Sequence, residues 1–149
     1  MNALENQIKE MYEKSFYDII DETISSDKPD CEWIIKLYSE IKGRLIKFIK
    51  PQSKVYKQID TEFDVEFFRH MLENNVFDNN SLLKLVNLTF YWIKFLGAPA
   101  RDKLVDDAKL KVLHAESSKI VSTFIREVNL CIDYIDEDII NYIKETKGL

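Results

Sequence analysis

The most apolar part of the chain is residues 81–96, interrupted by the charges of Lys84 and Lys94. Its apolar residues recur at spacings of three and four, which is the period of an α-helix. A helix that is apolar nearly all round is either buried in a core or spans a membrane, and a span needs about 20 mostly apolar residues. This stretch is shorter and contains charges. We therefore predict a buried central helix, with Leu85 and Trp92 nearly fully buried.

The same period recurs along most of the remaining chain. Residues 2–24 contain an apolar stripe with acidic residues off it, and Pro51 is expected to end the second helix, because the residue before a proline avoids helical angles. Three glycines and three prolines provide few of the turn signals of a β-sandwich or barrel. We predict an all-α fold for residues 1–149, a single helical bundle of five to seven helices around the central helix. The further helices are expected at 2–24, 30–50, 53–59, 62–74, from Pro99 to about 113, and from about 118 nearly to the end, and the first stripe comprises Leu4, Ile8, Met11, Tyr12, Phe16, Ile19, Ile20 and Ile24.

A corner is predicted at Gly97-Ala98-Pro99-Ala100-Arg101-Asp102. Gly97 suits the residue after a helix, where a left-handed conformation is common. Pro99 suits the first turn of the next helix, since its missing N–H is not needed there. Asp102 would then lie near a helix N-terminus, where its charge is favoured. We expect Arg101 to hydrogen-bond carbonyls left free at the end of the central helix.

Charge is unevenly distributed in the first half of the chain, with an acidic N-terminal helix followed by a basic segment. The net charge is −5, which argues against nucleic acid as a partner, but residues 31–60 carry seven basic and three acidic side chains. Four of these basic residues recur near helical spacing and form a candidate interaction surface. Two interpretations remain open, a solvated surface that balances the acidic N-terminal helix and a site for an acidic partner or anionic lipid. The four residues are Lys47, Lys50, Lys54 and Lys57.

The sequence contains none of the common patterns of catalytic or metal sites. His70 and His114 have no cluster of metal-ligating neighbours, and the acidic residues of 133–138 lack the spacing of a calcium loop and are expected to form a solvated face. No phosphate-binding loop, nucleophile elbow or Cys-x-x-Cys pair occurs. We predict no catalytic residue, metal or cofactor. Cys31 and Cys131 are expected to be buried, reduced thiols in a cytoplasmic protein, with a disulfide left open.

Two observations concern the origin of the chain and its place in the cell. The charged, amphipathic N-terminus does not resemble a signal peptide, and no transmembrane segment is expected. The frequent Ile, Lys, Asn and Phe residues suggest an AT-rich genome, such as that of a protist or a large virus.

The corner, from Leu96 to Asp102, resembles the Leu-Cys-Ala-Pro-x-Arg-Asp hallmark of the T-complex protein 11 family, with Gly97 in place of the usual cysteine. The resemblance covers roughly residues 29–105, with a weaker echo in 124–142, and the chain is far shorter than typical members. It corresponds to an N-terminal portion of the family's domain. Other matching positions are Pro29-Asp30, Trp33, Glu40-Ile41, Arg44-Leu45, residues 59–68 and Asn75-Val76-Phe77-Asp78.

The resemblance implies an all-helical, non-enzymatic protein associated with signal transduction, notably cyclic-AMP and protein kinase A pathways, and with sperm function. We therefore predict an intracellular interaction module with a protein partner. The alternative is a structural or assembly protein, for instance a viral component, that forms a homo-oligomer through its long C-terminal helix. The partner would dock on the basic residues of 42–57 or on apolar surface left open by the short chain, and we favour the apolar surface.

Overall fold

The computed structural model describes residues 2–26, 30–74 and 79–148, and in these residues the chain is helical, with no strand. The predicted all-α fold is therefore confirmed. The predictions for Pro29 and for residues 75–78 lie outside the described residues. The elements are α1 (Ala3–Ser25), α2 (Glu32–Ile46), α3 (Lys54–Glu62), α4 (Val65–Glu73), α5 (Asn79–Leu96), the 3-10 turn η1 (Pro99–Arg101), α6 (Asp102–Leu113), the 3-10 turn η2 (Ser117–Lys119) and α7 (Ile120–Lys147).

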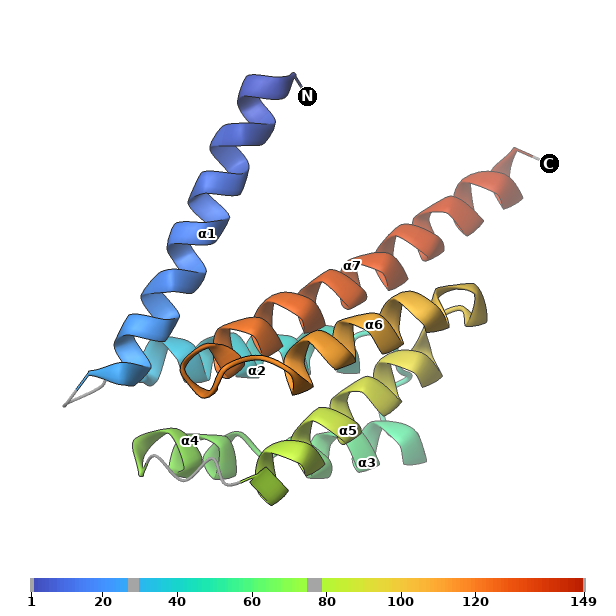
Figure 1. Ribbon diagram of the computed structural model, residues 1–149. Coiled ribbons are helices and arrows are strands. Elements are labelled where there is room, and N and C mark those ends of the chain that lie inside the picture. Colours follow the sequence, from blue (N-terminus) through green and yellow to red (C-terminus); the bar gives the residue numbers. More distant parts are fainter. Residues whose placement is uncertain (1, 27–29, 75–78, 149) are drawn as a thin grey trace.

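Six helices, α2 to α7, pack together, and α1 joins them only near its C-terminal end (Figure 1). The N-terminal part of α1 and the C-terminal part of α7 diverge from the bundle as two separate arms. No helix in the described part of the chain is long and apolar enough to cross a membrane. The bundle thus has a packed body and two projecting helices.

The core is shared by α5 and α7. Leu85 and Trp92 on α5 are 9% and 3% exposed, as predicted, and the Trp92 indole Nε1 donates to Glu62 Oε2 at 2.8 Å. One side of α5 nevertheless remains exposed, where Leu83 and Phe95 lie. Helix α7 packs against α1, α2, α5 and α6. The central position predicted for α5 is therefore shared with the longest helix. The buried residues of α7 are Val121, Ser122, Phe124, Ile125, Glu127, Val128, Cys131, Ile132 and Ile135.

Local hydrogen bonds define where several helices begin. Asn2 Oδ1 accepts from the backbone N–H of Glu5, and the side chains of Ser53 and Asp64 cap α3 and α4 in the same way. Such N-caps satisfy N–H groups that have no partner within the helix. Helix α2 ends at Ile46, four residues before the predicted end at residue 50, and the chain then turns through residues 47–52, which include Pro51.

Candidate functional site

Gly97 lies where α5 ends and the chain turns toward α6. Its backbone N–H donates to the carbonyl of Ile93 at 2.9 Å, which continues the helical pattern. No glycine in the described residues has a positive φ, so the predicted left-handed conformation of Gly97 is wrong. The missing side chain instead avoids a close approach to the backbone of the preceding turn. A Cβ at this position would lie 3.0 Å from the Ile93 carbonyl oxygen and 3.5 Å from Cγ1 of Ile135 on α7.

The residues after Gly97 suit the turn that they form. Ala98 is extended, with φ −78° and ψ 139°, as expected for a residue before proline. Pro99 is the first residue of η1, and its carbonyl accepts the backbone N–H of Asp102. Asp102 begins α6, where the unpaired N–H groups of the first turn favour a negative charge. The positions predicted for Pro99 and Asp102 are confirmed.

Arg101 fixes the corner to α7 rather than to α5. Its Nη2 donates to Asp138 Oδ1 at 2.8 Å and its Nε to Asp138 Oδ2 at 3.2 Å. Its guanidinium also lies 4.7 Å from the ring centroid of Tyr134. The predicted hydrogen bonds to carbonyls of the central helix are therefore wrong, because the carboxylate of Asp138 is the stronger acceptor. This hydrogen bond holds the pKa of the Asp138 carboxyl below its usual value.

Arg44 on α2 makes the equivalent connection on another side of α7. Its guanidinium donates to Asn129 Oδ1 at 2.9 Å, to Asp133 Oδ1 at 2.7 Å and to Asp136 Oδ2 at 2.9 Å. The acidic residues of 133–138 therefore pair with two arginines from distant parts of the chain. The predicted solvated face is largely present, since Asp133 and Glu137 are 65% and 60% exposed. The ion pairs were not foreseen, because the sequence gives no indication of partners 89 and 92 positions away.

Beside the corner, α5 and α7 border a hollow of about 310 Å³, which we call the corner hollow. Ala98 and Leu96 line one side, and Ile135, Ile139 and Tyr142 line the α7 side. The corner residues predicted from the sequence thus form one edge of an apolar hollow. Arg101 of the corner also binds α7, the helix that forms the other edge, through Asp138.

The four lysines predicted as an interaction surface, Lys47, Lys50, Lys54 and Lys57, lie around the turn from α2 to α3. All four are exposed. In the described part of the chain, no ion pair involves them, whereas Lys42 nearby pairs with Asp60 at 3.1 Å. Large apolar residues between these lysines pack against the core. This basic surface therefore offers charge without an exposed apolar anchor.

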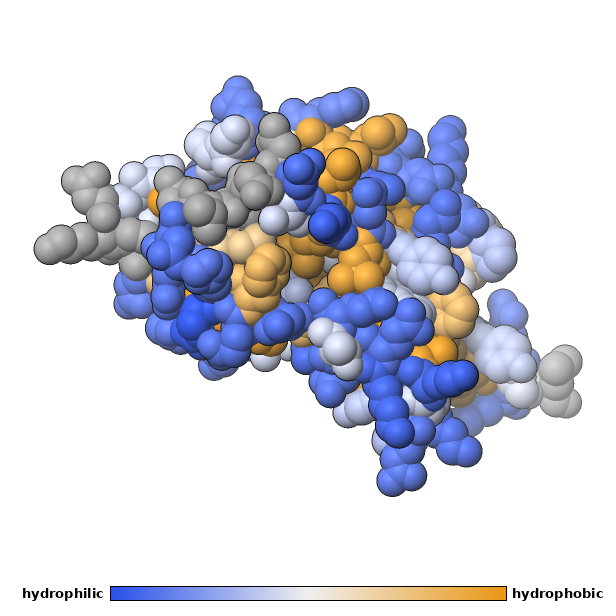
Figure 2. Space-filling model, turned by 90° about the horizontal axis from the view of Figure 1, so that it is seen from below, coloured by the Kyte–Doolittle hydropathy of each residue, from blue (hydrophilic) through white to orange (hydrophobic). Residues whose placement is uncertain are grey.

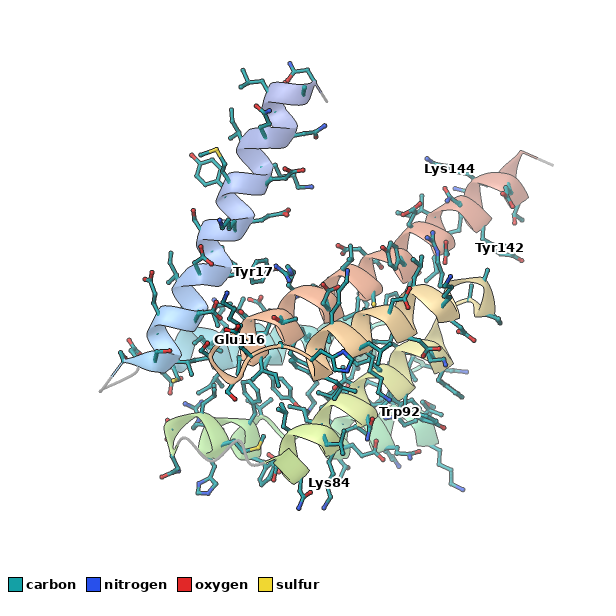
Figure 3. The ribbon with its side chains drawn as sticks, viewed as in Figure 1. Tyr17, Lys84, Trp92, Glu116, Tyr142 and Lys144 are labelled. Atoms are coloured by element: carbon teal, nitrogen blue, oxygen red, sulfur yellow. The ribbon has the colours of Figure 1, made fainter. Side chains whose placement is uncertain are left out.

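The apolar stripe predicted on the first helix divides between two faces of α1. Ile20 is fully buried, and Ile24 and Tyr17 pack against the core. At about 100° per residue, the other stripe residues except Phe16 fall on the opposite side of the helix, while Phe16 lies next to the side of Ile20 and contacts Trp33 of α2. Residues 2–16 are all exposed. Figure 3 shows Tyr17 on the side of α1 that faces α7. We call the outward set the α1 stripe, and its exposed fractions are Leu4 65%, Ile8 46%, Met11 69%, Tyr12 75% and Ile19 50%.

A second hollow, of about 190 Å³, lies between α4 and α5 and was not foreseen from the sequence. Phe67 and Met71 of α4 line it together with Leu85, Leu88 and Lys84 of α5. The view from below shows apolar side chains gathered between polar ones on the face formed by α3, α4 and α5 (Figure 2). No sequence signal marks this hollow, because its lining comes from separate helices that meet only in the fold.

The remaining candidate groups do not come together. His70 Nδ1 lies 3.0 Å from the side-chain amide of Asn74, and His114 ends α6. Within the described residues, no group of three or more His, Cys, Asp or Glu side chains is arranged to hold a metal ion. Cys31 and Cys131 are both free and buried, so their prediction as buried thiols is confirmed.

Comparisons with known proteins support the family resemblance that the corner motif suggested. The family model described as T-complex protein 11 matches residues 1–143. Mouse T-complex protein 11 is 26% identical over 105 residues, which make up 70% of this chain and 18% of the mouse protein. The chain thus matches less than a fifth of that relative's length. No solved structure matches the chain.

Proposed function

Because the chain belongs to the T-complex protein 11 family, we propose that it is a non-enzymatic, intracellular protein-interaction module with a regulatory role in signal transduction. The family resemblance supports this class of function and implies pathways of the cyclic-AMP and protein kinase A type. The matched part of the mouse relative is short, so any activity of that whole protein is part of this proposal.

The observation that carries the proposal is the α1 stripe. Its residues lie roughly opposite Ile20 and Ile24, which attach α1 to its own bundle. An amphipathic helix normally turns its apolar side toward its own core. Here one apolar side does so and a second one faces outward, and contiguous exposed apolar residues are typical of interaction sites. The α1 stripe is therefore the docking surface.

The charge around the α1 stripe indicates which charge its partner should carry. Residues 2–26 contain six acidic and two basic side chains. Glu5 and Asp18 border the stripe, Glu22 continues it toward the bundle, and Lys9 lies 3.9 Å from Glu13. We propose that the partner is an amphipathic helix with an apolar side and basic flanks, since such helices commonly bind through residues spaced three and four apart.

A second copy of the chain matches this description poorly. Its basic surface has no large exposed apolar residue within the described residues 30–66, and a second α1 carries the same negative charge. The basic surface itself is a weaker docking candidate, because exposed charges are screened within about 8 Å at physiological ionic strength. The apolar stripe would keep most of its affinity in salt.

A model peptide tests the proposal on the full chain. The probe is a labelled 20-residue helical peptide with a leucine stripe and lysine flanks, and its controls are the same residues scrambled and the same stripe with glutamate flanks. We expect the basic amphipathic peptide to bind at least tenfold more tightly than either control, as measured by fluorescence anisotropy. Equal binding of the scrambled peptide would contradict the docking surface.

Two variants separate the surfaces, both in this assay and in affinity capture from the native cell. Met11→Asp should abolish binding, since Met11 is 69% exposed and lies within the α1 stripe. Replacing the four lysines of the basic surface by glutamine should leave binding nearly unchanged, also at high salt. If the lysine variant loses the partner and Met11→Asp keeps it, the basic surface is the site.

An enzyme remains the contrasting class of function. A broad screen for hydrolase or transferase activity would favour it if turnover were found and then abolished by replacing one polar cluster, such as Arg101 with Asp138. We expect no turnover in such a screen, because the two arginine clusters on α7, Arg44 with Asp133 and Asp136 and Arg101 with Asp138, are closed by ion pairs.

A further inference from the structure

The hollow between α4 and α5, which we call the α4–α5 hollow, has a largely apolar wall. Phe68 and Met71 on α4 are 1% and 3% exposed, and Leu85 on α5 is 9% exposed. Phe67 also lines the hollow and is 51% exposed, so the hollow opens to solvent on that side. Its volume is about 190 Å³, and an apolar cavity of about 150 Å³ holds one benzene molecule. The α4–α5 hollow therefore has room for an aromatic ring with a short side chain.

One polar group on the wall of this hollow is buried and has no partner. Tyr38 of α2 lines the hollow and is only 1% exposed, and its ring stacks on that of Phe68 with the centroids 4.1 Å apart. Its hydroxyl makes no hydrogen bond to any described residue. Buried polar groups nearly always have a hydrogen-bond partner. The Tyr38 hydroxyl therefore marks the hollow as a place where a ligand with a polar group fits.

The charge beside this hydroxyl is negative. Burial and, to a smaller extent, the carboxylate of Asp64 raise the pKa of the Tyr38 hydroxyl, which therefore stays neutral. Asp64 also lines the hollow, and its Oδ1 accepts the backbone N–H of Phe67 at 3.1 Å as the N-cap of α4. Its Oδ2 has no partner among the described residues. A hydrogen-bond donor that enters the hollow thus meets a carboxylate oxygen and a hydroxyl oxygen, both of which accept.

The other charged residues of the wall do not alter this preference. Glu62 adds a second carboxylate, and its oxygens already accept from Trp92 Nε1 at 2.8 Å and from Gln58 Nε2 at 3.1 Å. Lys84 lines the hollow as well, but Figure 3 shows its side chain extending outward from α5. Two carboxylates at one site attract a cation and repel an anion. The wall therefore favours a positively charged ligand.

We propose that the α4–α5 hollow is a binding site for a small primary amine with an apolar body about the size of a benzene ring. The body is buried against Met71, Leu85 and Leu88, and the ammonium donates to Asp64 Oδ2 and to the hydroxyl oxygen of Tyr38. An aromatic body is preferred, because the thioether of methionine makes favourable contacts with aromatic rings. Helix α1 forms no part of the hollow, so the inference is independent of the function proposed above.

The first experiment titrates the full chain with phenethylamine and follows the methyl resonances by nuclear magnetic resonance. We expect saturable binding with a dissociation constant below about 1 mM, and the largest shifts at Met71, Leu85 and Leu88. Phenethyl alcohol has the same shape without the charge and should bind at least about tenfold more weakly, and phenylacetate more weakly still. Phenylacetate binding as tight as that of the amine, shifts confined to α1, or no binding of the amine at about 10 mM would overturn the proposal.

The second experiment removes the charge without removing the cap. Asp64→Asn keeps the N-cap of α4, because asparagine caps helices about as well as aspartate does. The affinity for phenethylamine should fall at least about tenfold, and its preference over phenethyl alcohol should disappear. Glu66→Gln is the matched control, since Glu66 carries the same charge two residues further along the chain and does not line the hollow. It should leave the affinity unchanged.

The third experiment separates a ligand contact from a structural role of Tyr38. Tyr38→Phe removes only the hydroxyl, so it should weaken phenethylamine binding roughly fivefold or more. The free energy of unfolding, measured in urea, should stay the same or rise, because the hydroxyl has no partner in the unliganded fold. Met11→Asp in the α1 stripe should leave phenethylamine binding unchanged, which distinguishes this site from the docking surface. Unchanged affinity in both Tyr38→Phe and Asp64→Asn would show that the amine does not bind as proposed.

Discussion

At the scale of single residues, two arginines connect α7 to α2 and to the corner through ion pairs. Arg101 and Arg44 each reach carboxylates on that helix from elements distant in sequence. A guanidinium can make two parallel hydrogen bonds to a carboxylate, which an ammonium cannot. The corner motif therefore acts through the geometry of its arginine as much as through its charge.

We expect Arg101→Ala to lower the free energy of unfolding, and Arg101→Lys to lower it less. The pKa of Asp138 is depressed in the folded chain by its hydrogen bond to Arg101, so this stabilisation is present above the unfolded pKa of an aspartate, about 3.9. It is lost as the pH falls through the folded pKa. Urea titrations at pH 7 and in steps below pH 4 should thus show wild type and Arg101→Ala converging in acid. A difference that grows in acid would contradict this account.

Gln52 occupies a backbone conformation that favours glycine. Its φ is 72°, and the Ser53 N–H donates to the Lys50 carbonyl across the turn at 3.2 Å. A side chain at such an angle costs about 1–2 kcal/mol, and the greater freedom of glycine in the unfolded chain offsets about 0.5–1 kcal/mol. Gln52→Gly should therefore raise the free energy of unfolding by up to about 1.5 kcal/mol. The same change at Gln58, inside α3, should lower it.

At the scale of elements, α5 presents one buried and one exposed side. Leu85 is 9% exposed and Leu83 is 45% exposed on the same helix. Leu85→Ala should lower the free energy of unfolding by about 2–5 kcal/mol through lost burial and a cavity, whereas Leu83→Ala should cost far less. Chemical denaturation of the two variants measures the contrast. Equal losses would mean that the exposed side of α5 is covered in solution.

Helix α1 should be the least protected of the long helices. Residues 2–16 are exposed throughout, and a helix of this length without packing is only marginally stable in water. Backbone amides of residues 6–16 should therefore exchange with solvent within seconds, while those of residues 124–132 on α7 should exchange only on global unfolding. Exchange followed by mass spectrometry compares these segments. Slow exchange in α1 of the free chain would indicate that another surface covers it.

At the scale of the whole molecule, periodicity predicted the order of the helices but not their partners. The apolar spacings placed α1, α6 and α7 close to their observed bounds, because a 3.6-residue period follows from the geometry of one helix alone. The same spacings cannot tell an apolar side that meets its own core from one that faces outward. Ile20 and Met11 belong to one sequence pattern and lie on nearly opposite sides of α1.

Long-range contacts account for most of the other differences. The pairing of Arg44 with Asp133 and of Arg101 with Asp138 depends on how α7 crosses α2 and the corner, which no local pattern encodes. The role of Gly97 was likewise misjudged, because the atom closest to a Cβ at this position is the Ile93 carbonyl oxygen, whose approach depends on how the last turn of α5 is closed. The sequence therefore identified the corner correctly and assigned the wrong reason to two of its residues.

The two buried thiols should react with alkylating reagents at different rates, and these rates report how different parts of the fold open. Burial raises the pKa of the Cys131 thiol to about 12 and also raises that of Cys31, and only the thiolate reacts readily with alkylating reagents. Cys131 lies in the middle of α7, so its alkylation requires the core to open, whereas Cys31 lies at the start of α2. Mass-resolved alkylation in the native state should modify Cys31 first, and the interval before Cys131 reacts measures how long the core stays closed after the edge has opened.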